Sequence, residues 1–117
     1  MRNEYLAFAC ALASGVAACG SYPAPADKMA TTTAAARSAE ELGASKTPKA
    51  EFHLKLAQEQ LADAKKLMVE GENKRAEYVL SRASSDAELA LMLAREASMK
   101  AEAQKAQDDV RALKKAE

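Results

Sequence analysis

One histidine and two short polar clusters are the side chains of this sequence that could take part in catalysis. His53 is the only histidine among 117 residues. It has no cysteine partner or obvious carboxylate triad, so we expect an ordinary half-exposed residue rather than an acid–base group or metal ligand. Asp108 and Asp109 point about 100° apart on a helix and do not converge. Ser84-Ser85-Asp86 lies within a predicted helix without a base nearby. No glycine-rich phosphate loop occurs either, so we predict a non-enzymatic protein without a metal or cofactor.

The two cysteines lie in or directly after an uncharged amino-terminal segment. Residues 5–18 carry no charge and follow a short polar start, MRNE. This segment is shorter than the roughly 20 apolar residues of a bilayer-spanning helix, and it suits the apolar region of a secretory signal. A buried core helix is the first alternative, but it would need a polar face that the segment lacks. A disulfide between Cys10 and Cys19 is the second, and it requires both cysteines to remain in the mature chain.

The end of this segment, Val16-Ala17-Ala18-Cys19, resembles the signal of bacterial lipoproteins, in which an aliphatic residue and two small residues precede an invariant cysteine. The resemblance implies cleavage before Cys19, removal of Cys10 with the signal peptide (residues 1–18), and lipidation of the Cys19 sulfur. Two or three acyl chains would hold the protein at a membrane almost permanently. Gly20-Ser21 follows without an aspartate, which implies delivery to the outer membrane, facing the periplasm. Residues 19–25 would then form a lipidated flexible tether.

The composition of the remaining chain favours an all-α fold. Aromatic residues make up only 4% of the sequence, and helix-forming residues dominate. Residues 26–43 predict a weak helix between Pro25 and Gly43, weakened by three consecutive threonines at 31–33. Residues 45–117 predict an antiparallel hairpin with a long C-terminal helix, its two helices spanning about 48–70 and 73–115 and separated by Gly71.

Two apolar stripes with alternating steps of four and three residues carry the hairpin prediction. The first comprises Ala50, Leu54, Ala57, Leu61, Ala64 and Met68, and the second comprises Ala76, Leu80, Ala83, Ala87, Ala90, Ala94, Ala97 and Ala101. Small alanine side chains let the helix backbones approach closely, but they bury little area and predict modest stability. The pairs Glu51–Lys55 and Glu96–Lys100 have favourable helical spacing on exposed faces.

The predicted C-terminal helix is much longer than its partner, so residues beyond about 96 should project past the hairpin. They carry an apolar stripe of their own, which we call the seam: Met99, Ala103, Ala106, Val110 and Leu113. A seam without an intramolecular partner indicates a coiled-coil contact, with a second copy or with another envelope protein. A frayed, alanine-rich tail is the alternative that the sequence leaves open.

The hairpin resembles two known patterns. Residues 64–83 are similar to one tetratricopeptide unit, but a binding array of such units needs about three. Residues 39–97 resemble the bacterial domain-of-unknown-function 4398 family, through HLKLAQEQLADAKKL at 53–67, GENKRAEYVL at 71–80 and ASSDAELALMLA at 83–94. This resemblance implies a short secreted lipoprotein of two-membrane bacteria, and it implies no activity.

The function predicted from these features is a lipid-anchored helical interaction or scaffold module of the cell envelope. Its 17 basic and 17 acidic residues argue against nucleic acid as a partner. A structural spacer like the murein lipoprotein is the first alternative, although that protein ends in a lysine and this sequence ends in Lys114-Lys115-Ala116-Glu117. A small-ligand or metal binder is the second, and the scarcity of aromatic and histidine residues argues against it.

Overall fold

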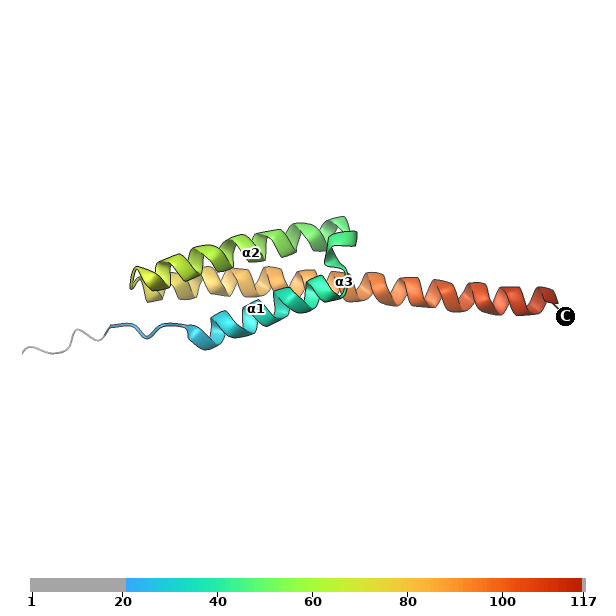
Figure 1. The fold of residues 1–117 in the computed structure, drawn as a ribbon, viewed down its shortest axis with the longest axis horizontal. Coiled ribbons are helices and arrows are strands. Elements are labelled where there is room, and N and C mark those ends of the chain that lie inside the picture. The colour runs from blue at the N-terminus through green and yellow to red at the C-terminus, as the bar shows by residue number, and fades with distance from the viewer. Residues whose placement is uncertain (1–20, 117) are drawn as a thin grey trace, which may run out of the picture.

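The computed structural model describes residues 21–116, which form three α-helices and a short 3₁₀ turn (Figure 1). Helix α1 spans Ala26–Glu41, α2 spans Pro48–Val69 and α3 spans Asn73–Ala116, with the 3₁₀ turn at Ala44–Lys46 between α1 and α2. The all-α prediction and the long C-terminal helix are therefore confirmed. The predicted signal peptide, residues 1–18, lies outside the described residues.

Helix α1 contains the three threonines, and two of their hydroxyls bond to the preceding helical turn. Thr31 Oγ1 donates to the carbonyl of Asp27 at 3.0 Å, and Thr33 Oγ1 donates to that of Met29 at 2.7 Å. Such bonds are available to β-branched hydroxyl residues within a helix. Gly43 follows the helix with φ +82°, a left-handed conformation that favours glycine and reverses the chain.

The turn between α2 and α3 is a Schellman motif centred on Gly71. The backbone N–H of Glu72 donates to the carbonyl of Leu67 at 2.8 Å, and that of Gly71 donates to Met68 at 3.1 Å. Gly71 has φ +77°, which glycine adopts without the steric cost of a Cβ. The GEN sequence at 71–73 thus ends α2 and lets α3 begin at Asn73.

The three helices form a bundle around the first half of α3. Helix α2 runs antiparallel to α3, as the two stripes predict, and α1 lies on α3 as a third, parallel member (Figure 1). The apolar stripes predict no packing position for α1, but α1 packs on both α2 and α3, and the hairpin is therefore part of a three-helix bundle. Its core consists mainly of fully buried alanines, with Leu80 and Leu54 as the large buried apolar side chains.

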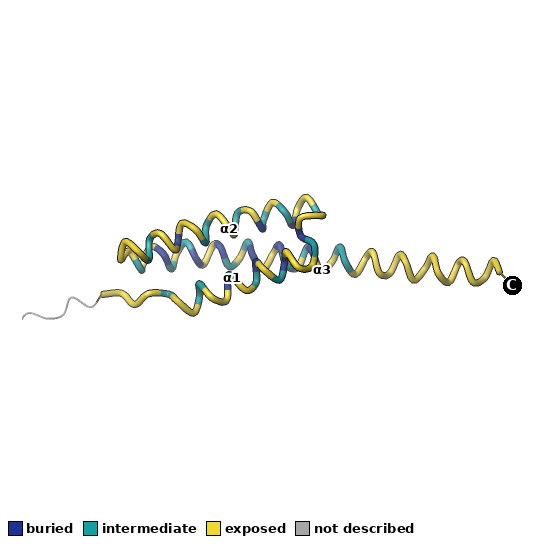
Figure 2. The backbone as a smooth tube through the Cα atoms, in the orientation of Figure 1, coloured by how far each residue is buried: buried dark blue, intermediate teal, exposed yellow. Residues whose placement is uncertain are grey.

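The second half of α3 leaves the bundle (Figure 2). The last buried residue of α3 is Ala94. Ala97 and Ser98 are half-buried, and every residue from 99 to 116 is exposed. We call residues 99–116 the tail; it is about 27 Å long at 1.5 Å per residue. The prediction that residues beyond about 96 project past the hairpin is correct. Within the described residues, no helix is both long and apolar enough to cross a membrane.

Candidate functional site

The tail presents the predicted seam on one side of an exposed helix. Met99, Val110 and Leu113 are 63%, 53% and 70% exposed, and Ala103 and Ala106 between them are exposed as well. Steps of four, three, four and three residues keep all five within a narrow strip of the helix surface. The structure therefore brings the five seam residues together, and nothing in the described part of the chain covers them.

The seam does not continue the buried stripe of α3. Met99 follows Ala94, the last buried residue, by five positions, which places it about 140° further around the helix. The buried stripe would continue instead through Ala97 and Ala101, of which the first is half-buried and the second exposed. Consequently, a partner on the seam would lie on a different side of α3 from the groove that α1 and α2 fill.

Two residues that the sequence analysis missed extend this exposed face toward the bundle. Met92 is 61% exposed and precedes Met99 by seven residues, and Leu89 is 42% exposed three residues earlier. The missed signal was the seven-residue spacing of Met92, Met99, Ala106 and Leu113, which returns to the same side of a helix. Residues 89–93, LALML, are all apolar, so the sequence pattern does not indicate which of these side chains are buried.

A charged residue interrupts this face between Met92 and Met99. Glu96 Oε1 lies 2.5 Å from Lys100 Nζ, which confirms the predicted ion pair. The hydrogen bond and the positive charge of Lys100 hold the pKa of the Glu96 carboxyl below its ordinary value. Glu96 therefore keeps its negative charge at neutral pH, and the uninterrupted part of the apolar face begins at Met99.

A polar cluster joins α2 to α3 at His53, and it corrects one expectation. The sequence predicts no base near Asp86, but His53 Nδ1 is 2.9 Å from Asp86 Oδ1, and Gln60 Nε2 donates to Asp86 Oδ2 at 2.9 Å. These residues are 33 and 26 positions from Asp86 in the sequence. The antiparallel packing of two helices brings them together, which no local pattern reveals.

The two serines that precede Asp86 form hydrogen bonds with residues other than His53. Ser84 Oγ donates to Glu88 and Ser85 Oγ donates to the carbonyl of Ser81, so neither hydroxyl is bonded to His53. Among residues 21–116, no three histidine, cysteine or acidic side chains are grouped so that they could hold a metal ion. We interpret the half-buried His53–Asp86 pair as a polar contact that fixes the register of α2 on α3.

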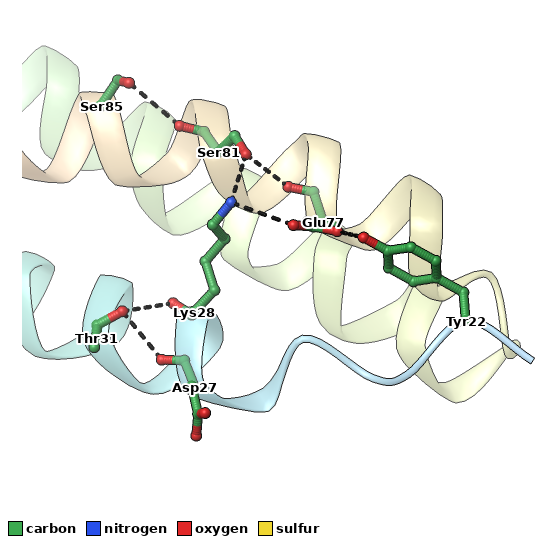
Figure 3. A network of polar contacts seen from close by, with 7 residues as sticks. All are labelled: Tyr22, Asp27, Lys28, Thr31, Glu77, Ser81 and Ser85. Atoms are coloured by element: carbon green, nitrogen blue, oxygen red, sulfur yellow. Dashed lines mark hydrogen bonds and ion pairs between the residues drawn. The ribbon is translucent and has the colours of Figure 1, made fainter.

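The amino-terminal end of the described chain is tied to the start of α3 (Figure 3). The Tyr22 hydroxyl donates to Glu77, and Asn73 Nδ2 donates to the Tyr22 carbonyl at 2.8 Å. Lys28 of α1 donates to Ser81 Oγ at 2.8 Å and lies 3.8 Å from Glu77. Tyr22, in the described part of the predicted tether, is thus held beside the start of α3.

The predicted lipidation residue, Cys19, and the cleavage motif, Val16, Ala17 and Ala18, lie outside the described residues. The chain matches the family described as Domain of unknown function (DUF4398) over residues 27–107. This match covers α2, nearly all of α1 and α3 as far as Gln107, so it ends before Val110 and Leu113 of the seam. No curated protein and no solved structure matches the chain significantly.

Proposed function

The chain belongs to the DUF4398 family, and from that premise we propose that it is a lipoprotein of the outer membrane, facing the periplasm. Its helical bundle acts there as a non-enzymatic interaction or scaffold module. The observation that supports this proposal is the separation of the two ends. The chain enters the bundle at Tyr22, beside the start of α3, and the exposed seam lies toward the opposite end of α3 (Figure 1).

The distances suit a short anchor and a projecting contact surface. Tyr22 follows Cys19 by three residues, so a lipid on Cys19 would hold Tyr22 within about 10 Å of the acylated residue. Helix α3 begins beside Tyr22 and contains 44 residues, which corresponds to a length of about 66 Å. An anchored bundle standing upright would therefore carry the seam far from the membrane surface, where a periplasmic protein can reach it.

Labelling with a radioactive fatty acid tests the anchor. We expect the wild-type chain, expressed in a bacterium with two membranes, to incorporate palmitate and to fractionate with the outer membrane. Cys19→Ser should abolish labelling and leave an uncut precursor, because the thiol is the acylated group. The matched variant Cys10→Ser should be labelled normally. Labelling that persists in Cys19→Ser, or that depends on Cys10, would disprove the anchor.

Site-specific photo-crosslinking in living cells tests the interaction role. A photoreactive residue at Met99 should give a discrete crosslinked product, because Met99 lies on the seam. The matched position is Asp108, which is equally part of the exposed tail but points about 180° away from Met99. Equal yields of the same product from both positions, or no product from either, would contradict a specific contact on the seam.

The spacer alternative makes a different prediction. The last described residues include Lys114 and Lys115, and a wall-linked spacer would use a lysine amine for covalent attachment. Peptidoglycan sacculi boiled in detergent should then retain the protein and release it only after digestion of the wall. Complete loss on boiling would exclude the covalent spacer and leave the interaction module.

A further inference from the structure

We propose that the tail of α3 binds the tail of a second copy of this chain as a parallel, in-register coiled coil. This inference rests on the proposed interaction role of the bundle, and it does not depend on the lipid anchor. It identifies the partner on the seam as the chain itself.

The seam has the spacing of the two core positions of a coiled coil. With Ala103 and Val110 at position a, the residues Met99, Ala106 and Leu113 fall at position d, and this assignment holds for every seam residue. All five are exposed in the single chain. Facing a second copy, each side chain would enter a hole between four side chains of the other helix and leave water.

The charges beside the seam select a parallel partner. Position g holds Glu102 and Asp109, whereas position e holds Lys100, Gln107 and Lys114. One flank of the seam is thus acidic and the other is basic or neutral. In a parallel pair, position g of one helix faces position e of the next heptad in the other, so Asp109 meets Lys114 of the second copy and Glu102 meets Gln107.

An antiparallel pair would place like charges together. In that orientation, position g of one helix faces position g of the other, and position e faces position e. Glu102 would therefore face Asp109 of the second copy, and Lys100 would face Lys114. Both contacts are repulsive. The acidic and basic flanks of the tail therefore complement a second copy in the parallel orientation alone, which is the observation that identifies the occupant.

The residues before Met99 limit the length of the contact. Glu96 falls at position a, and Arg95 at position g would face Lys100 of the second copy. Both features oppose pairing, so the coiled coil should begin at Met99 and comprise two to three heptads. So short a contact is marginal in water, and we expect a dissociation constant on the order of 0.1 mM for the free protein. Confinement of two copies to one membrane would raise their effective concentration.

Sedimentation equilibrium of a chain that begins at Ser21 tests the self-association. The contacts that hold the bundle are made within residues 21–116, and circular dichroism before and after each substitution verifies the helices. We expect a monomer–dimer equilibrium that Ala103→Lys abolishes, since it places a charge on the seam. The matched variant Ala101→Lys, on the opposite side of the tail, should dimerise as the wild type does. Monomers at up to about 1 mM would overturn the proposal.

A charge exchange tests the parallel orientation. Asp109→Lys and Lys114→Asp should each weaken the dimer about fivefold, because each replaces two interchain attractions with repulsions. The double exchange restores opposite charges and should recover most of the affinity. These two residues are five positions apart and do not meet within one helix. Tightening by Asp109→Lys alone would indicate an antiparallel pair, and failure of the double exchange to recover would also refute the parallel model.

The experiments distinguish self-pairing of the tail from the interaction role and from the lipid anchor. If the free chain stays monomeric while a photoreactive residue at Met99 captures a product other than the homodimer, the interaction role stands and self-pairing is wrong. If the chain dimerises but incorporates no palmitate, self-pairing stands and the anchor is wrong.

Discussion

Replacing Leu80 by alanine should strongly destabilise the bundle, because its core has little else that is large. Leu80 is fully buried on α3, whereas most of the other core side chains are alanines. Leu→Ala loses the transfer free energy of the side chain and leaves a cavity, which together cost about 2–5 kcal/mol in buried sites. The buried alanines that make up most of the core have no side-chain torsion with which to fill the space. We therefore expect a loss of about 3 kcal/mol or more.

That loss is large beside the total stability. A domain of this size is stable by about 5–10 kcal/mol, so the variant should unfold at a much lower urea concentration than the wild type. The measurement is urea unfolding followed by far-ultraviolet circular dichroism, at micromolar concentration, where the proposed dimer is dissociated. The slope of the transition should change little, because the surface exposed on unfolding is nearly the same.

Leu113→Ala is the matched control for Leu80→Ala. It makes the same substitution on the same helix, but Leu113 is 70% exposed and lies in the tail. We expect a change below about 0.5 kcal/mol in the unfolding free energy. If Leu80→Ala costs less than about 1 kcal/mol, or if the two variants are equally destabilised, the packing of α3 against α1 and α2 described above is wrong.

Three further predictions concern polar groups. Thr32→Val should stabilise the chain by about 1 kcal/mol in urea unfolding, because the buried Thr32 hydroxyl has no hydrogen-bond partner; destabilisation would mean that it has one. Asp86→Ala should cost about 1–2 kcal/mol in the same assay, since His53 loses its partner; an unchanged midpoint would exclude the cluster as a register contact. In an NMR titration, Glu96 should ionise below the ordinary pKa of glutamate, and Lys100→Ala should return it to that value. A carboxyl with a lowered pKa stabilises the helix above its unfolded pKa and loses this effect as the pH falls through the folded pKa.

The sequence alone determined the three helices and the ends of α2, whereas α1 ends two residues before the predicted position. Both apolar stripes have helical spacing, Pro48 begins α2, and Gly71 supplies the left-handed residue that ends it. These are local effects of backbone conformation and side-chain periodicity, so they do not depend on distant residues. For the same reason the projecting tail followed from the sequence, since two antiparallel helices of unequal length cannot cover each other completely.

Tertiary structure alone decided which surfaces meet. Residues 26–43 have no clear apolar stripe, so their position on α3 depends on small buried residues such as Ala36 and Ala39, and on the contacts of Lys28 with α3. The His53–Asp86 contact likewise joins residues far apart in the sequence. Between positions 89 and 93 nearly every side of α3 is apolar, so only the packing of α1 and α2 distinguishes the covered Ala90 from the exposed Met92. The physical reason is that burial depends on which neighbour occupies each side of a helix, and a sequence pattern specifies the sides without specifying the neighbours.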